Sequence, residues 1–138
     1  MRAIFSSDEE LRRRASDTAR RVTESNRELL TPYADEIIGF LGASGADNWR
    51  TRAHLGLVAA RVAHTHAQRL RAAPILRALV SDPSNVVRCS GVEGVAELAI
   101  AEPSLRGEAE EIMHRAAISG TQAMRCRAKN SGLLARED

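Results

Sequence analysis

An arginine recurs along the chain at a nearly constant interval. The four arginines are separated by 38, 38 and 37 residues, and an apolar residue precedes each: Leu11-Arg12, Trp49-Arg50, Val87-Arg88 and Met124-Arg125. Periods of this length are typical of chains built from one repeated supersecondary unit. Such a unit cannot bury its apolar face alone, so the spacing restricts the fold to units that stack on their neighbours.

Other apolar positions keep the same register. Thirteen residues before the last three arginines stand Ile37, Ile75 and Ile112, and nine before them stand Leu41, Leu79 and Ala116. Seven residues after all four arginines stand Ala19, Leu57, Val95 and Gly132. Residues at helical spacing on both sides of the last three arginines indicate two helices per unit.

The helix start and stop signals of the chain predict helices at about 8–30, 32–42, 49–63, 68–80, 87–101, 105–118 and 122–136. In the first, Ser7 and Glu10 fit a capping box, and Leu11, Ala15, Ala19 and Val22 form the expected inward stripe. Apolar residues make up 43% of the chain and aromatic residues only 3%, so the core must consist of Ala, Leu, Val and Ile. No stretch alternates as a half-buried strand does, and an all-α fold is expected.

The stretch 68–101 carries the sharpest pattern, with Pro74 in its first helix, Asp82 in its turn, and Val87 and Arg88 opening its second helix. This unit resembles a HEAT repeat, a helical hairpin that stacks into α-solenoids. The resemblance implies an α-α superhelix, a short HEAT-like solenoid of antiparallel helix pairs. Residues 1–138 then form a single domain, with a half-repeat cap at 1–30 and helix pairs at 31–66, 67–102 and 103–138.

The resemblance also implies where a partner binds. Second helices of HEAT-like units line a concave face, and the candidate partner-binding residues there are Arg14, Arg21, Arg52, Glu93, Glu97 and Arg127. A structural ladder that ties units together is expected from Asp82, Arg12, Arg50, Arg88 and Arg125, with Arg88 bonding Asp82 or a neighbouring turn. The implied function is non-catalytic binding of another protein or an acidic peptide.

Two alternatives remain open. Residues 1–77 hold 13 arginines against 9 acidic residues, so this half could bind a nucleic-acid backbone. Some HEAT-like DNA glycosylases use Trp, Asp and Arg on the concave face, but Trp49 is the only tryptophan here and is expected in the core. An enzyme is therefore not expected.

No cofactor or metal is expected. His64 and His66 lack a third ligand at motif spacing, and Cys89 and Cys126 are expected to be free thiols. No run of apolar residues is long enough to span a membrane and no signal sequence opens the chain, which favours a cytoplasmic location. Leu133 and Leu134 are expected to be exposed, which would allow a weak homodimer through the C-terminal repeat in place of a monomer.

Overall fold

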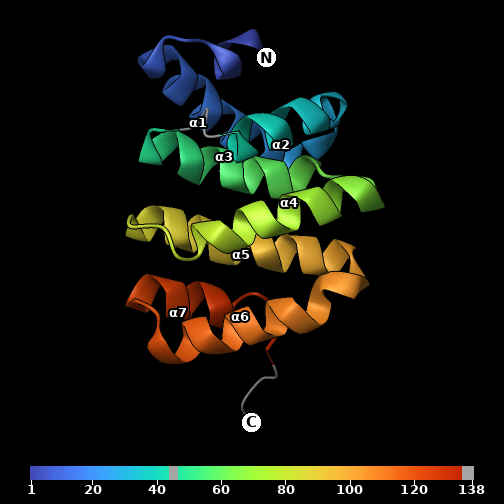
Figure 1. The fold of residues 1–138 in the computed structure, drawn as a ribbon, viewed down its shortest axis with the longest axis vertical. Coiled ribbons are helices and arrows are strands. Elements are labelled where there is room, and N and C mark those ends of the chain that lie inside the picture. Colours follow the sequence, from blue (N-terminus) through green and yellow to red (C-terminus); the bar gives the residue numbers. More distant parts are fainter. Residues whose placement is uncertain (44–46, 135–138) are drawn as a thin grey trace.

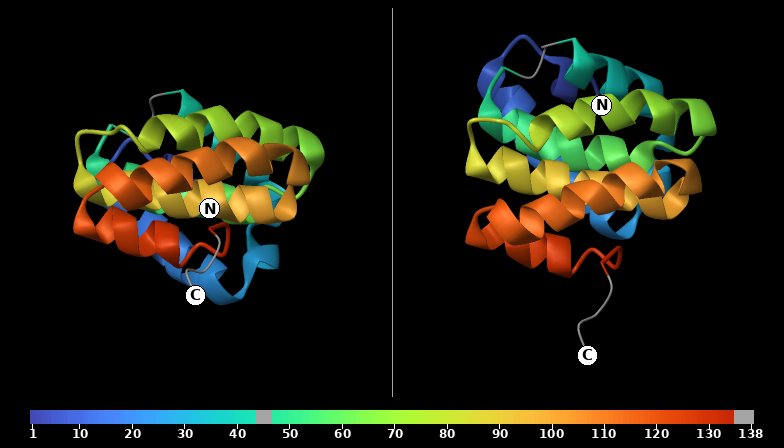
Figure 2. Two further views of the ribbon diagram at one scale, coloured as in Figure 1. Left: turned by 90° about the horizontal axis from the view of Figure 1, so that it is seen from below. Right: turned by 60° about the horizontal axis from the view of Figure 1, so that its bottom comes forward.

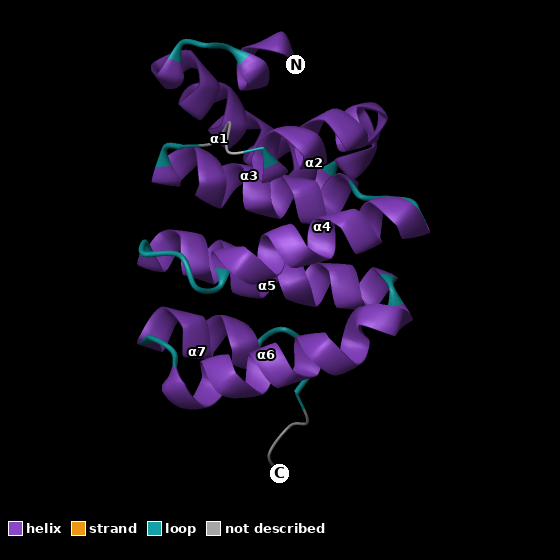
Figure 3. Cartoon of the chain, in the orientation of Figure 1, coloured by secondary structure: helices purple, strands orange, loops and turns teal. Residues whose placement is uncertain are grey.

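The computed structural model describes residues 1–43 and 47–134. Within these ranges it confirms an all-α chain, with seven α-helices and no strand (Figure 3). The helices are α1 (Glu9–Ser25), α2 (Ala34–Gly42), α3 (Trp49–Val62), α4 (His66–Leu79), α5 (Asn85–Ala101), α6 (Arg106–Ser119) and α7 (Gln122–Lys129). Short 3-10 turns are η1 (Arg2–Phe5), η2 (Arg27–Leu29), η3 (Thr31–Tyr33) and η4 (Pro103–Leu105).

The helices succeed one another along the long axis, from α1 at one end to α7 at the other (Figure 1). The odd-numbered helices form one layer, in which α1 packs on α3, α3 on α5, and α5 on α7. The even-numbered helices lie against them, with α2 packed on α3, α4 on α5 and α6 on α7. The left view of Figure 2 separates α4 and α6 from α1 and α7, with α5 between.

Side chains fix the starts of most helices. Oxygens of Asp8, Asn48, Ser84 and Thr121 each accept a backbone N–H from the first turn of the helix that follows. Thr65 and Gln68 form a reciprocal capping box at the start of α4. The predicted capping box at Ser7 is wrong, because Asp8 caps α1 by accepting the Leu11 N–H at 3.0 Å. A carboxylate also suits the positive end of a helix dipole.

Two predicted helices end early. The first was predicted to reach residue 30, but α1 ends at Ser25, and Asn26 leaves the helical region with φ −146°. The last was predicted to reach Arg136, which lies outside the described residues, but α7 ends at Lys129. By contrast, α4 is continuous through Pro74.

The inward face of α1 differs from the predicted stripe. Its buried residues are Ser16, Ala19 and Thr23, whereas Leu11 is 47% exposed. The two hydroxyls face the core because each bonds within its own helix: Ser16 donates to the Arg12 carbonyl at 2.7 Å and Thr23 to the Ala19 carbonyl at 2.8 Å. A buried hydroxyl satisfied in this way carries little desolvation cost.

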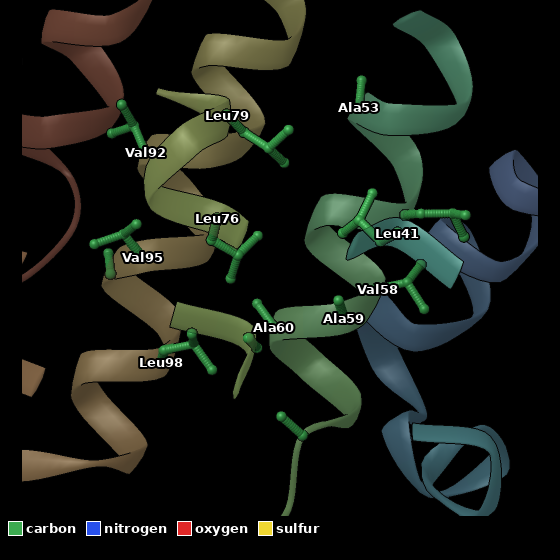
Figure 4. Packing of buried hydrophobic residues seen from close by; sticks show 14 of the residues in the cluster. Leu41, Ala53, Val58, Ala59, Ala60, Leu76, Leu79, Val92, Val95 and Leu98 are labelled. Atoms are coloured by element: carbon green, nitrogen blue, oxygen red, sulfur yellow. The ribbon is translucent and has the colours of Figure 1, made fainter. Parts of the chain in front are cut away.

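The middle of the core is packed around Leu76 of α4, which is fully buried. Its side chain lies between α3 and α5 and points toward Ala60 (Figure 4). Gly94 of α5 makes room for it, since a Cβ at Gly94 would lie 3.0 Å from a Leu76 methyl. These three helices therefore approach closely because small residues face a large one.

Residues that open or follow helices depart from their expected burial. Trp49 is 37% exposed and is not a core residue, because it opens α3 at the surface. After α7 the chain turns at Gly132, whose φ of +80° favours glycine, and Leu133 returns to the core with 6% exposure. The prediction of an exposed Leu133 is therefore wrong, while Leu134 is partly buried and the weak homodimer through the C-terminal repeat stays a prediction. Within the described ranges, no helix has the length and apolar character needed to cross a bilayer.

Candidate functional site

All six predicted partner-binding residues lie on the odd-numbered helices. Arg14 and Arg21 are on α1, Arg52 on α3, Glu93 and Glu97 on α5, and Arg127 on α7. The exposed surface of the odd-numbered helices is called the odd-helix face below; of the six residues, only Glu93, Glu97 and Arg127 line one hollow on it. Every one of the six takes part in an ion pair with another residue of the chain, so the face is charged but internally compensated.

The pairs on α1 are local and exposed. The Arg14 Nε lies 2.9 Å from a Glu10 carboxylate oxygen, and the Arg21 guanidinium lies 3.1 Å from Asp17. The side chains of Arg14 and Arg21 are 74% and 71% exposed. Hydrogen bonds from Arg13 and Arg14 lower the Glu10 pKa to about 2. Exposed pairs of this kind are worth between roughly 0 and 1 kcal/mol, so a partner could displace them.

Arg52 is held more firmly. Its Nε and one terminal nitrogen donate to the Asp82 carboxylate at 3.0 and 3.3 Å, joining α3 to the turn before α5. The two side chains are 25% and 11% exposed. Burial tends to raise the pKa of Asp82, but the Ser84 backbone N–H and the Arg52 guanidinium lower it overall. Arg52 thus joins neighbouring helix pairs, a role that the sequence assigned to the ladder arginines.

Three of the four ladder arginines brace the start of their own helix. Arg12 donates to the Ser6 carbonyl at 2.9 Å, Arg88 to the Asp82 carbonyl at 2.7 Å, and Arg125 to the Gly120 carbonyl at 2.9 Å. Arg50 instead places its guanidinium 4.4 Å from the centre of the Trp49 ring. The bond from Arg88 therefore reaches the backbone of Asp82, while Arg52 takes its carboxylate.

A second set of ion pairs links the layer from α7 back to η2. Arg127 Nε lies 2.6 Å from Glu93, which joins α7 to α5. Glu97, one turn farther along α5, lies 3.0 Å from the Arg27 guanidinium and 3.9 Å from Arg61 Nε. Arg61 also donates to the Arg20 carbonyl of α1 at 2.8 Å. Sequence reasoning missed Arg27 and Arg61 because neither lies at the repeated arginine position.

A hollow of about 330 Å³ opens beside these pairs, between α5 and α7. It is lined by Glu93, Ala96, Glu97, Ile100, Arg127, Asn130 and Ser131. Ile100 is 65% exposed although it sits on a core helix. This surface, called the α5–α7 hollow below, combines one exposed apolar side chain with charged and amide groups. Two of its lining residues, Asn130 and Ser131, follow the early end of α7, which the sequence pattern did not predict.

His54 of α3 lies at the contact between α3 and α1. Its Nδ1 accepts a hydrogen bond from Arg20 Nε at 3.1 Å, and Asp17 lies 3.8 Å away. Burial lowers the pKa of His54 below 6.5, and Arg20, Arg13 and Arg21 add to this, while Asp17 opposes them. The imidazole is therefore neutral in the fold at pH 7, with Nδ1 as the acceptor.

This environment predicts a pH dependence of stability. As the pH falls below about 6.5, the unfolded chain takes up a proton at His54 before the folded chain does, so the free energy of unfolding decreases until the pH passes the folded pKa. Urea unfolding between neutral and mildly acidic pH measures this slope. His54→Gln, whose amide oxygen can still accept from Arg20, is expected to flatten it. The exposed His114→Gln serves as control, and an equal flattening there would contradict the assignment.

The remaining histidines and cysteines form no common site. At the start of α4, His66 Nδ1 lies 2.8 Å from a carboxylate oxygen of Glu102, which follows α5. His64 Nδ1 lies 3.1 Å from the Val62 carbonyl. In the part of the chain that the structure describes, no group of three His, Cys, Asp or Glu residues could hold a metal ion. Cys89 and Cys126 are free, as predicted, and burial raises the pKa of the Cys89 thiol.

Comparisons with protein-family models, with curated proteins and with solved structures find no match for this chain.

Proposed function

We propose that this chain is a non-catalytic protein-binding module, and that its partner docks on the odd-helix face at the α5–α7 hollow. We also propose that its helix pairs form a short HEAT-like solenoid. The ordered succession of α2/α3, α4/α5 and α6/α7 supports this assignment, together with the repeated register of the arginines. The single observation that carries the binding proposal is the exposed Ile100 within a charged hollow.

The composition of the hollow suits a protein partner. Ile100 offers an apolar contact that loses its water on binding, and the Glu93–Arg127 pair and Asn130 surround it with polar groups. An apolar centre within a polar rim is the usual anatomy of a protein interface. Burying a side chain of this size is worth roughly 1.5–3 kcal/mol, which is enough to anchor a contact.

Charge argues against a nucleic-acid backbone at the same place. The α5–α7 hollow holds two glutamates and one arginine, so phosphate groups would meet a net negative lining. In the arginine-rich half, Arg14, Arg21 and Arg52 each have a carboxylate partner already. Because phosphate contacts release counterions, backbone binding would weaken steeply with salt. The proposed protein contact predicts a weak salt dependence instead.

The position of Trp49 does not support a glycosylase-like enzyme. Trp49 stands at the first turn of α3 with the Arg50 guanidinium against its ring. One face of the Trp49 ring is therefore covered by Arg50, and Trp49 does not line the α5–α7 hollow.

Ile100→Glu tests the proposal. The tagged protein is used to recover partners from lysate of its source, with and without nuclease, and affinity for the recovered protein is then measured. Ile100→Glu is expected to weaken binding about tenfold or more, because it removes an apolar contact and adds a charge beside Glu97. Ile118→Glu is the matched control, since Ile118 is 77% exposed on α6, away from the hollow.

Equal binding by both variants would contradict the proposal, as would recovery that vanishes on nuclease treatment. Arg14→Glu with Arg21→Glu tests the nucleic-acid alternative, because both side chains are exposed and their pairs are local. Arg52 is left unchanged in this test, since its loss would free the half-buried Asp82 carboxylate and disturb the fold.

A further inference from the structure

The α4–α5 and α6–α7 turns lie on the same side of the molecule (Figures 1 and 3). Residues of both turns line a second hollow, which is larger than the first. Its volume is about 680 Å³, and its walls come from the end of α4, the start of α5, α6 and the start of α7. It shares no lining residue with the α5–α7 hollow. The surface is called the turn groove below.

Three arginines and no acidic residue line the turn groove: Arg77, Arg88 and Arg115. Arg88 uses one terminal nitrogen to hold the carbonyls of Asp82 and Pro83, at 2.7 and 3.1 Å. Its Nε and second terminal nitrogen make none of the hydrogen bonds found among the described residues. This arginine is therefore fixed in place with donors to spare, which is the condition for bidentate recognition of a carboxylate.

The other two arginines differ in how far they are compensated. Arg77 is paired through one terminal nitrogen with Glu108 of α6, an exposed contact. Arg115 lies on α6, as Glu108 does, and its side chain makes no ion pair and no hydrogen bond within the described residues. Glu111 stands one turn before Arg115 and does not line the groove. The groove thus carries a positive charge that the chain itself compensates only in part.

Part of the lining of the groove is apolar. Val80, Ile112 and Met124 contribute to the lining, and no aromatic side chain does. Recognition of a single-stranded nucleic acid relies on bases stacked on aromatic rings. Arginines beside apolar side chains instead suit a peptide that carries both carboxylates and aliphatic side chains.

We infer that the turn groove binds an acidic peptide segment of a partner protein. Carboxylates of the segment pair with Arg77, Arg88 and Arg115, and aliphatic side chains of the segment rest on Val80, Ile112 and Met124. This contact is separate from the one proposed at the α5–α7 hollow, so either surface can act without the other. A partner that engages both would gain affinity from the second contact through its effective concentration.

The test uses fluorescence anisotropy with a short labelled peptide in which Glu alternates with Leu. Arg115→Gln is expected to weaken binding about tenfold, and Arg77→Gln together with Arg115→Gln more strongly, because each removes a charge-assisted contact. Arg106→Gln is the matched control: it lies on the same helix, removes the same charge, pairs with Glu110 and does not line the groove. Ile100→Glu is expected to leave binding of the peptide unchanged.

Three results would overturn the inference. The first is the absence of saturable binding of the Glu-Leu peptide to the unmodified protein. The second is an equal loss of affinity in Arg106→Gln and Arg115→Gln, which would show a response to net charge alone. The third is tighter binding of an oligodeoxythymidylate of the same charge, which would assign the groove to a phosphate backbone. Circular dichroism of each variant confirms that the helices are retained.

Discussion

Leu76→Ala is expected to lower the free energy of unfolding by about 2–5 kcal/mol. Leu76 is fully buried, and small residues, Gly56, Ala60 and Gly94, surround its side chain. Small residues cannot extend into the space that truncation leaves, so most of the cavity persists. A domain of this size is stable by about 5–15 kcal/mol, and the loss is a large fraction of that.

Urea unfolding followed by circular dichroism measures the effect. Leu70→Ala is the control, because it makes the same change on the same helix at a side chain that is 42% exposed. A loss below about 0.5 kcal/mol is expected there, as for surface positions generally. Similar losses for the two variants would show that α4 does not insert Leu76 between α3 and α5.

Gly91→Ala is expected to destabilise the protein by about 1–3 kcal/mol, although alanine is the better helix former by about 1 kcal/mol. A Cβ at position 91 would lie 2.7 Å from the Val80 nitrogen and 2.9 Å from the Leu79 carbonyl carbon. Both are backbone atoms at the end of α4, so no side-chain rotation relieves the overlap. The end of α4 and the adjoining turn must move away from α5.

Gly107→Ala provides the opposite sign. Gly107 lies in the first turn of α6, where an added Cβ would meet nothing within 4 Å, so alanine should raise the free energy of unfolding by up to about 1 kcal/mol. Thermal or urea unfolding of the two variants side by side checks both signs. Stabilisation by Gly91→Ala would mean that α4 and α5 are farther apart than described.

The periodic part of the sequence determined most of the fold. The starts of α3, α5 and α7 lie within two residues of their predicted positions, and Ile37, Leu41, Leu79 and Ile112 are buried at the repeated positions. These features depend on local capping and on helical spacing, which a single sequence displays. The HEAT-like pattern drew attention to Asp82 and Arg88, and both do hold the α4–α5 turn.

The departures arise where packing overrides pattern. Hydrophobicity placed Leu11 inward, but Ser16 and Thr23 face the core because their hydroxyls bond within α1. Gly132 occupies the repeat position of Val95, yet its positive φ ends the last unit and returns Leu133 to the core. Neither hydroxyl bonding nor a left-handed turn leaves a periodic signature in the sequence.

The positions of the candidate residues could be predicted from the sequence, whereas their role in binding stays a prediction. The register of the arginines placed all six candidate residues on the helices that are α1, α3, α5 and α7 in the structure. It could not show which charges find partners, since the contacts of Arg52 with Asp82 and of Arg27 with Glu97 span 30 and 70 residues. Residues at or beyond helix ends line both hollows, and a sequence pattern places helix ends less precisely than it places the helices themselves.

Hydrogen–deuterium exchange of the protein with and without its recovered partner tests the central claim most directly. Docking at the α5–α7 hollow predicts slower exchange in residues 93–100 and 127–131, with residues 106–118 of α6 unchanged. Ile100→Glu should abolish that protection, while Ile118→Glu should retain it. Protection confined to α2, α4 and α6, or protection that Ile100→Glu leaves intact, would contradict the proposed binding face.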